Sequence, residues 1–462
     1  MFIGRKDELA FLQKQATRQQ ASLVVLYGRR RVGKTELLRH FCQDRQAIFF
    51  TCTEVPDAVQ LRHFSQAILK TGIPASRYID SFSEWESAFM ALLEVPFSGR
   101  KLIVIDEFPY MARANAAIPS ILQKVWDTSL RNQDIMLVLC GSSMSFMEKE
   151  ILSEKNPLYG RATGILNIRE MGFYDAIQFV PDYSPEDRIA TYAIVGGIPH
   201  YLKQFDPSLP LSENVINSIL TRGSILYSEV EFLLRQELRE TATYNTIIEA
   251  IALGNTKLND IHTRTQIERT KLPAYLRNLI DLGIIHREFP IGTSIKERAK
   301  SHRGLYQLST AYFRFWYHFV FPNISALEMG DAPGIWKNDV LPQLNAYIST
   351  AFEGICREYL MRRNIAGKLP FRFVDIGRFW TNTTEIDLVA FDRMRHHFLL
   401  GECKYRNAPV GQDILDALME KAKAVSPRHP DTVLLFSKHG FTETLIPDDH
   451  LSLIDLNQLV EG

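Results

Sequence analysis

Short, nearly continuous apolar runs recur along the first third of the chain. They cover residues 22–27, 47–52, 101–106 and 135–140, and each is rich in Val, Ile, Leu or Phe. Runs of this length without polar alternation are typical of strands that are buried on both faces of a parallel sheet. The segments between them place apolar residues at helical spacing. This alternation predicts a doubly wound α/β domain over residues 1–165.

The pattern changes to mostly helical spacing after about residue 165. We expect residues 166–240 to form a helical lid. In residues 241–330, three short helical patterns precede two β-like runs, at 284–289 and 304–308. Three helices followed by a two-stranded wing are the elements of a winged helix.

Strand-like runs return in the last part of the chain. A helical pattern at 343–363 is followed by three strand-like runs, a second helical pattern and a final strand-like run at 432–436. The order is therefore α-β-β-β-α-β, and it predicts a separate α/β domain over residues 331–462. The three strand-like runs of this domain cover residues 371–376, 385–391 and 397–404.

The composition narrows the class of protein. The 462 residues include 53 basic and 53 acidic side chains and are 46% hydrophobic, which excludes wholesale disorder. No apolar run reaches the ~20 residues that cross a bilayer, and the first residues lack the apolar stretch of a signal peptide. Five scattered cysteines without a C-x-x-C pair exclude a disulfide scaffold and a cysteine-rich zinc site. We therefore expect a cytoplasmic protein with no membrane partner.

A phosphate-binding motif follows the first apolar run. Residues 28–35 read G-R-R-R-V-G-K-T, which matches G-x-x-x-x-G-K-[ST] between a strand and a helix. Glycines let successive N–H groups turn inward around a phosphate, and the helix N-terminus adds a positive end. We expect Lys34 at the β- and γ-phosphates of ATP and Thr35 at Mg²⁺. The candidate nucleotide contacts are Gly28, Arg29, Arg30, Arg31, Val32, Gly33, Lys34, Thr35 and Glu36.

Two acidic residues, Asp106 and Glu107, end the apolar run at 101–106. An acid at the carboxyl end of a neighbouring strand would lie beside the phosphate-binding loop. We expect Asp106 to hold Mg²⁺ through water and Glu107 to polarise the water that attacks ATP.

Polar residues after the next apolar run have two interpretations each. Ser142 or Ser143 would sense the γ-phosphate or cap the following helix. Arg161, in P-L-Y-G-R, is a candidate arginine finger that would act within its own chain or on a neighbouring subunit of an oligomer. A surface salt bridge is the other interpretation of Arg161.

In combination, these motifs resemble the archaeal-type P-loop ATPases of the STAND branch near the AAA+ proteins. The opening F-I-G-R is similar to the family's N-terminal box, which lies by the adenine, and the resemblance makes Gly4 and Arg5 candidate nucleotide contacts. G-G-I-P-H-Y-L at 196–202 is similar to the family's GG-x-P-x-YL element, which adds Pro199. The resemblance covers roughly residues 1–240, and it implies that the family's winged helix and nuclease-like domain of unknown function follow.

The α-β-β-β-α-β order resembles that of the PD-(D/E)XK nucleases and implies a restriction-endonuclease-like domain. The matching residues are Glu353 on the first helix, Asp387 in E-I-D, and Glu402 and Lys404 in E-C-K. Glu402 and Lys404 are two apart on a strand, so their side chains share one face, which should meet Asp387. The resemblance implies that Asp387 and Glu402 bind Mg²⁺, that Lys404 activates a water, and that Glu353 completes the metal shell. Gln412 is a further candidate.

Basic residues are concentrated in residues 241–330, which carry eleven Lys and Arg against seven Asp and Glu. Such a segment is compatible with nucleic-acid binding, and a solvated surface is the alternative. Pro273 interrupts the third helical pattern and moves the expected start of that helix to Leu272. The candidate phosphate contacts are Arg269, Lys271 and Arg277 on the third helix and Lys296, Arg298, Lys300 and Arg303 in the wing.

These features predict an ATPase module that binds and hydrolyses ATP·Mg²⁺ and a C-terminal domain that cuts or grips DNA or RNA. The lid and the winged helix would relay the nucleotide state between them. One alternative is a nucleotide-gated switch or assembly platform whose last domain binds a partner without cutting. Another is an ATP-driven remodeller of proteins. Metal binding near Asp387 and Glu402 would separate a nuclease from a switch.

Overall fold

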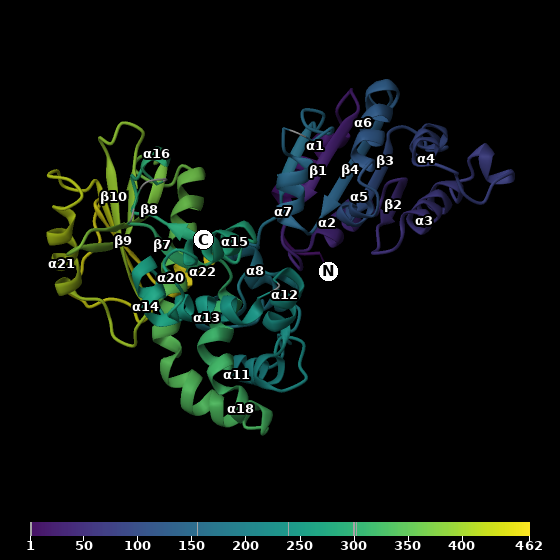
Figure 1. Cartoon of the computed structure of the whole chain (residues 1–462). Helices are drawn as coiled ribbons and strands as arrows, with labels where there is room; N and C mark the ends of the chain where they lie inside the picture. Colours follow the sequence, from purple (N-terminus) through teal and green to yellow (C-terminus); the bar gives the residue numbers. More distant parts are fainter. Residues whose placement is uncertain (1, 155, 239, 299–300, 302) are drawn as a thin grey trace. The chain divides into compact units, whose positions relative to one another are not determined.

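Two compact units make up the computed structural model (Figure 1). Unit 1 contains Met1–Met171 and Ile198–His200, and unit 2 contains Gly172–Gly197 and Tyr201–Gly462. The structure describes residues 2–154, 156–238, 240–298, 301 and 303–462.

Unit 1 is built on a five-stranded parallel sheet with the strand order β2-β3-β4-β1-β5. Alternate residues of β1 enter two cores on opposite faces, with Leu23 and Val25 in one and Val24 and Leu26 in the other. This burial on both faces explains why the predicted strands are apolar at nearly every position. The strands are β1 (Ser22–Tyr27), β2 (Ala47–Thr51), β3 (Lys101–Asp106), β4 (Ile135–Gly141) and β5 (Gly164–Asn167).

The helices of unit 1 follow the strands in alternation, as the apolar pattern predicts. They are α1 (Lys6–Ala16), α2 (Lys34–Cys42), α3 (Asp57–Leu69), α4 (Trp85–Met90), α5 (Phe108–Ala114), α6 (Ile118–Thr128) and the single turn α7 (Met144–Phe146).

The sheet corrects the sequence interpretation in two places. Strand β5 was not predicted, because its four residues are only partly buried and form no apolar run. The expectation that the strand of Asp106 is a neighbour of the strand before the phosphate-binding loop is also wrong, because β4 lies between β1 and β3. An apolar run indicates a buried strand but does not say which strand lies beside it.

Unit 2 contains the predicted order of three helices followed by an antiparallel strand pair. Strands β6 and β7 pair from Ile285↔Leu308 to Glu288↔Leu305. Helix α15 begins at Leu272 with Pro273 in its first turn, as the sequence predicts. The elements are α13 (Thr241–Ala252), α14 (Leu258–Thr265), α15 (Leu272–Asp281), β6 (Ile285–Glu288), α16 (Ile295–Arg298) and β7 (Leu305–Leu308).

Unit 2 has further helices, and a buried aromatic run at residues 315–317 begins at the end of one of them. The tryptophan of this run, Trp316, donates from its indole N–H to the carbonyl of Tyr227 at 2.8 Å, so its one polar atom is satisfied inside the core. These helices are α8 (Phe173–Ala176), α9 (Pro185–Val195), α11 (Leu211–Val215), α12 (Glu229–Glu237), α17 (Ala311–Phe315), α18 (Ile324–Glu328), α19 (Ala332–Ile335) and α22 (Leu456–Glu461); α10 (Pro199–Leu202) begins in unit 1.

A second five-stranded sheet, with the order β12-β11-β10-β9-β8, forms the C-terminal part of unit 2. It is mixed, because β8, β9 and β10 pair antiparallel whereas β10, β11 and β12 pair parallel. Helices α20 and α21 cover opposite faces, since α20 places Tyr359 against Phe436 while α21 packs Leu418 with Leu435. The elements are α20 (Leu341–Ile365), β8 (Asp375–Trp380), β9 (Glu385–Phe391), β10 (Phe398–Lys404), α21 (Gln412–Ala422), β11 (Thr432–Ser437) and β12 (Leu451–Ile454).

The α-β-β-β-α-β order is confirmed, but its first strand is not where the sequence placed it. The structure has β8 at Asp375–Trp380 instead of residues 371–376, because Gly377 and Arg378 interrupt the apolar pattern before Phe379 and Trp380. Strand β12 and helix α22 extend the predicted order. No helix of the described residues is long and apolar enough to cross a membrane.

Candidate functional site: a phosphate-binding loop and a second acidic cluster

The phosphate-binding loop connects β1 to α2, and its backbone requires glycine at two points. A Cβ on Gly28 would lie 2.2 Å from the carbonyl oxygen of Ile168, so no larger residue fits there. Gly33, with φ of 92°, and Arg31, with φ of 70°, are both in the left-handed region. Left-handed residues in such a loop turn backbone N–H groups toward a common point, as anion binding requires.

Lys34, Thr35 and Asp106 converge at the start of α2. The Thr35 hydroxyl donates to Asp106 Oδ2 at 2.7 Å, although β3, which carries Asp106, is not a neighbour of β1, which leads into the loop. Lys34 Nζ donates to the carbonyl of Arg29 within the loop, at 2.8 Å. Burial lowers the pKa of Lys34, and the charges of Glu107 and Asp106 oppose that shift. The structure thus brings together the three side chains predicted at the phosphates and at Mg²⁺.

Glu107 lies beside this cluster in a left-handed conformation, with φ of 53°, and precedes α5. Its Oε2 accepts hydrogen bonds from the hydroxyl of Ser142, at 2.8 Å, and from the Ser142 backbone N–H, at 3.3 Å. Ser142 therefore orients the Glu107 carboxylate, which neither interpretation of Ser142 from the sequence includes. Ser143 accepts a hydrogen bond from Arg113 at 3.2 Å.

Arg5, in the N-terminal F-I-G-R box, contacts the phosphate-binding loop. Arg5 is buried and donates to the carbonyls of Val32, at 2.8 Å, and Arg169, at 2.7 Å. Gly4 precedes it with φ of 66°. The guanidinium thus ties the loop to the end of β5, a structural role that the resemblance does not imply. The predicted adenine contact of Gly4 and Arg5 stays a prediction.

Pro199 reaches the loop from the G-G-I-P-H-Y-L element. Its Cγ lies 3.6 Å from the position that a Cβ on Gly33 would take. His200 Nε2 lies 2.5 Å from an Arg31 nitrogen. Pro199 and His200 therefore lie against the phosphate-binding loop. The nucleotide contact that the resemblance implies for Pro199 stays a prediction. Of the remaining loop candidates, Arg29 forms an ion pair with Glu170 at 3.9 Å, Arg30 and Val32 lie within the loop and Glu36 is exposed on α2.

Arg161 forms the salt bridge that was its alternative interpretation. Its guanidinium binds both carboxylate oxygens of Asp127, at 2.7 to 3.0 Å, and donates to the carbonyl of Pro157. The hydrogen bond from Arg161 is the main reason why the pKa of Asp127 is lowered. A role for Arg161 as an arginine finger would require this bidentate pair to break.

A second acidic cluster lies where β9 and β10 separate. Their pairing runs from Phe398↔Phe391 to Gly401↔Leu388, and Asp387 and Glu402 are the next residue on each strand. Asp387 Oδ2 accepts from the backbone N–H of Cys403 at 2.8 Å. Burial and the charge of Glu402 raise the pKa of Asp387 to about 6. The structure thus brings Asp387 and Glu402 together as predicted.

Two lysines approach Glu402 from different elements. Lys404 Nζ lies 2.7 Å and Lys421 Nζ 3.2 Å from Glu402 Oε1. The other carboxylate oxygen, Glu402 Oε2, is buried and has no hydrogen-bond partner among the residues that the structure describes. Lys421 was not predicted, because its position on α21 shows no relation to Glu402 in the sequence.

Glu353 faces an arginine instead of joining the two carboxylates. Arg378 Nε lies 3.5 Å from Glu353 Oε2, and the same guanidinium forms ion pairs with Glu288 and Glu385. Burial and the charge of Asp387 raise the pKa of Glu353 to about 8 against the opposing charge of Arg378. The Gln412 side chain also does not join the two carboxylates and instead donates to Asp416 at 2.9 Å.

No group of three or more His, Cys, Asp or Glu side chains among the described residues is arranged to hold a metal ion. The predicted set of Asp387, Glu402 and Glu353 is therefore not assembled as one triad. Two carboxylates with water and a substrate phosphate are nevertheless a common ligand set for Mg²⁺. The unpaired buried oxygen of Glu402 fits such a cation, because it is otherwise an unsatisfied polar atom.

The pKa of Glu353 predicts a pH dependence of stability. The pKa of Glu353 is about 8 in the folded state, and its usual value is near 4.5. Between these two pH values the folded state keeps a proton on Glu353 that the unfolded state has released. The free energy of unfolding should therefore fall as the pH rises through this interval. Between pH 5 and pH 7, the free energy of unfolding of Glu353→Gln should therefore fall by about 1–3 kcal/mol less than that of wild type. Urea unfolding at both pH values measures it.

Glu385→Gln is the matched control, because Glu385 binds the same arginine but its side chain is 55% exposed. An equal pH slope in wild type and Glu353→Gln would contradict the prediction.

Of the three basic residues predicted on the third helix, only Arg277 lies on α15, because Arg269 and Lys271 precede its first residue, Leu272. All three are exposed. Lys271 pairs with Glu268 at 3.0 Å. In the wing, Lys296, Arg298 and Arg303 are also exposed, and Arg298 donates to the carbonyl of Thr293. Lys300 lies outside the described residues.

Comparisons with known proteins agree with the nucleotide site. A family model described as an ATPase domain predominantly from Archaea matches residues 2–205, and one described as archaeal and bacterial proteins of unknown function matches residues 316–422. The uncharacterised protein MJECL04 of Methanocaldococcus jannaschii is 34% identical over 408 residues, which are 88% of each chain. The chain belongs to this family of archaeal-type P-loop ATPases. The predicted ATPase assignment is thereby confirmed.

Two further similarities concern parts of this archaeal-type ATPase. The uncharacterised ATP-binding protein MJ0423 of M. jannaschii is 48% identical over 46 residues, which are 10% of this chain and 78% of that protein. The solved structure of the Walker-type ATPase PABY2304 of Pyrococcus abyssi is 20% identical with a TM-score of 0.51 and covers 68% of this chain and 96% of that one. This likeness shows a shared fold. The nuclease assignment of the C-terminal domain stays a prediction.

Proposed function

We propose that this Walker-type ATPase hydrolyses ATP with Lys34 at the β- and γ-phosphates and Glu107 as the group that orients and deprotonates the attacking water. The observation that carries this proposal is the 2.7 Å hydrogen bond from Thr35 to Asp106, with Lys34 directly before Thr35 and Glu107 directly after Asp106. These groups come from a loop and a strand that are 71 residues apart, yet they meet at one point.

Thr35 and Asp106 would hold Mg²⁺, which when bound neutralises charge on the phosphates. The residues fit the ion, because a hydroxyl and a carboxylate are hard oxygen ligands. Lys34 contributes a positive charge at the γ-phosphate, where negative charge is greatest. Glu107 holds the water in line with the γ-phosphate and accepts its proton, and Ser142 keeps the carboxylate in place.

Lys34→Ala tests this assignment through nucleotide affinity. Removing the ammonium group should weaken ATP binding by about 10- to 100-fold, because a charge-assisted contact to phosphate is lost in a buried site. Titration with a fluorescent ATP analogue measures the effect. Lys14→Ala, on the last turn of α1, is the control and should bind ATP like wild type. Equal affinity of Lys34→Ala and wild type would exclude the proposed role.

A second candidate function is metal-dependent cleavage of a phosphodiester at the C-terminal cluster. The observation that favours it is Glu402, which presents a buried unpaired oxygen beside Asp387 and holds Lys404 at 2.7 Å. Asp387 and Glu402 would hold Mg²⁺, which when bound polarises the phosphate. Lys404 would orient a water and offset charge on the phosphate. A Mg²⁺- or Mn²⁺-dependent cleavage assay on DNA and RNA tests this function.

The proposal assigns residues 1–165 to ATP hydrolysis, 166–240 to a lid, 241–330 to a winged helix that contacts nucleic acid and 331–462 to cleavage. The exposed Arg269, Lys271 and Arg277 and the exposed basic residues of the wing support a phosphate-binding surface. If the chain binds Mn²⁺ and nucleic acid but never cuts, we propose the nucleotide-gated switch as its function instead.

A further inference from the structure

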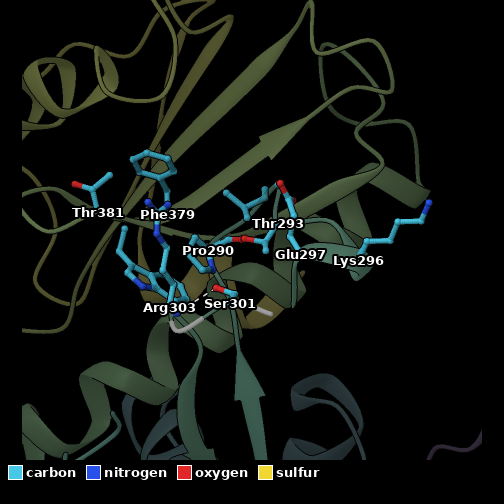
Figure 2. A pocket seen from close by; sticks show the side chains of 11 residues that line it. Pro290, Thr293, Lys296, Glu297, Ser301, Arg303, Phe379 and Thr381 are labelled. Atoms are coloured by element: carbon cyan, nitrogen blue, oxygen red, sulfur yellow. Dashed lines mark hydrogen bonds between the residues drawn. The ribbon is translucent and has the colours of Figure 1, made fainter. Parts of the chain in front are cut away.

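A cavity of about 1030 Å³ opens between the wing and the end of β8. Its walls come from two segments far apart in the sequence, one with lining residues at 290–293, 296–297, 301 and 303 and the other at residues 379–381. The backbone N–H of Ile291 donates to the carbonyl of Arg378 at 2.8 Å, which fixes the wing to this edge strand. We call this cavity the wing groove, and Figure 2 shows eight of its lining residues with labels.

The β8 wall of the wing groove is aromatic. Phe379 packs with Ile291 against the core of the C-terminal sheet, so it forms a fixed wall. Trp380 is only half-buried, and the Arg378 guanidinium lies 5.7 Å from its ring. Thr381 ends this wall with a hydroxyl. A half-exposed indole beside a cation is a surface on which a planar base can stack.

The wing wall is polar and basic. Lys296 and Arg303 are exposed, and within the described part of the chain neither forms an ion pair with an acid. The only acid among the lining residues, Glu297, accepts a hydrogen bond from the Ser294 backbone at 2.8 Å, which lowers its pKa. Arg395 adds another positive charge nearby, since it donates to the carbonyl of Gly292. The rim therefore carries a net positive charge.

We propose that the wing groove binds unpaired nucleotides of a nucleic-acid strand, with a base on Trp380 and phosphates at Lys296 and Arg303. Cations on one wall and a half-buried aromatic on the other match the two parts of a nucleotide. A duplex does not fit, because its bases are stacked within the helix and cannot enter a cavity to meet an indole.

The wing groove lies next to the second acidic cluster along the sheet. Trp380 pairs with Glu385 across β8 and β9, and Asp387 is two residues further on β9, about 7 Å along the strand. A strand held in the groove would thus have its backbone near Asp387. This inference rests on the proposed phosphodiester cleavage, for which it names a single strand as the substrate.

Fluorescence anisotropy of a labelled 15-nucleotide oligo(dT) or oligo(U), with the full chain in EDTA, tests the proposal. EDTA removes the metal ion that cleavage needs, so this assay measures binding alone. A chain that binds the oligonucleotide but never cuts it would contradict only the cleavage proposal. Lys296→Gln combined with Arg303→Gln should weaken binding by roughly tenfold and reduce the slope of log affinity against log salt by about 1.4. Both side chains are exposed, so this variant should fold.

Trp380→Leu should weaken binding by about fivefold or more, whereas Trp380→Phe, which keeps an aromatic face, should bind nearly like wild type. Lys337→Gln is the matched control, because Lys337 is exposed on unit 2 but does not line the groove. Wild-type affinity of the double variant would overturn the proposal. Tighter binding of a duplex, or full displacement by thymidine monophosphate at equal concentration, would also overturn it, because each would show that no unpaired strand is required.

Discussion

Glu107→Gln is expected to lower kcat for ATP hydrolysis by about 10²- to 10⁴-fold, the usual contribution of a positioned general base. Glutamine has the size of glutamate and keeps a side-chain oxygen that can accept from Ser142, as Glu107 Oε2 does at 2.8 Å. The local backbone should therefore be retained, including the left-handed residue at this position. An amide, however, cannot accept a proton from water at neutral pH. The substitution thus removes the proton acceptor and keeps the local backbone and the hydrogen bond from Ser142.

Phosphate release at saturating ATP measures kcat, and titration with a fluorescent nucleotide shows whether binding is retained. ATP affinity should change little, because Lys34, Thr35 and Asp106 are untouched. Glu36→Gln is the matched control, since Glu36 is exposed on the first turn of α2. Wild-type kcat in Glu107→Gln would mean that another group handles the water. A loss of ATP affinity equal to the loss of kcat would mean that Glu107 holds the nucleotide instead.

The nucleotide site could be predicted from the sequence because most of it is local. The loop at residues 28–35 needs glycine where a side chain would collide with a neighbouring strand, and its Lys and Thr follow directly at the start of a helix. Asp106 and Glu107 were found because they end an apolar run, and the carboxyl ends of parallel strands lie at one edge of a sheet. Each step uses only neighbours in the chain and general sheet geometry.

The groups that hold this site in place could not be predicted in the same way. Arg5 reaches the carbonyls of Val32 and Arg169, and Ser142 reaches Glu107, through contacts that depend on the packing of strands β4 and β5. The strand order was also hidden, because buried runs such as β3 and β4 look alike in the sequence. Long-range partners carry no periodic signal, so only the folded chain shows them.

The C-terminal cluster illustrates the same limit. The strand order and its resemblance to the PD-(D/E)XK nucleases, together with the two-residue spacing of Glu402 and Lys404, predicted that these residues share a site with Asp387. They gave no sign of Lys421 beside Glu402, and none of Arg378, whose guanidinium holds Glu353, Glu288 and Glu385. The sequence thus predicted which carboxylates lie together and missed the cations that pair with them.

Asp387→Asn is expected to lower metal-dependent cleavage by about 10³-fold, because a metal ion supplies several kcal/mol of charge stabilisation at the phosphate. Asparagine keeps an oxygen that can accept from the Cys403 backbone, as Asp387 Oδ2 does at 2.8 Å, so β9 and β10 should keep their arrangement. The negative charge is lost, and only the Glu402 carboxylate remains to attract a cation. Mn²⁺ affinity without nucleotide, measured by the electron paramagnetic resonance of free Mn²⁺, should fall in parallel.

Lys404→Met separates binding from chemistry, because it leaves both carboxylates and removes the cation that Glu402 holds at 2.7 Å. It should keep Mn²⁺ affinity and lose cleavage, whereas Asp387→Asn should lose both. Asp413→Asn, exposed on the first turn of α21, is the control and should retain both. Cleavage that persists in Asp387→Asn would place the reaction elsewhere. Wild-type protein that holds Mn²⁺ at Asp387 but cuts neither DNA nor RNA would instead favour a switch, in which the cluster grips a strand whose release depends on ATP hydrolysis.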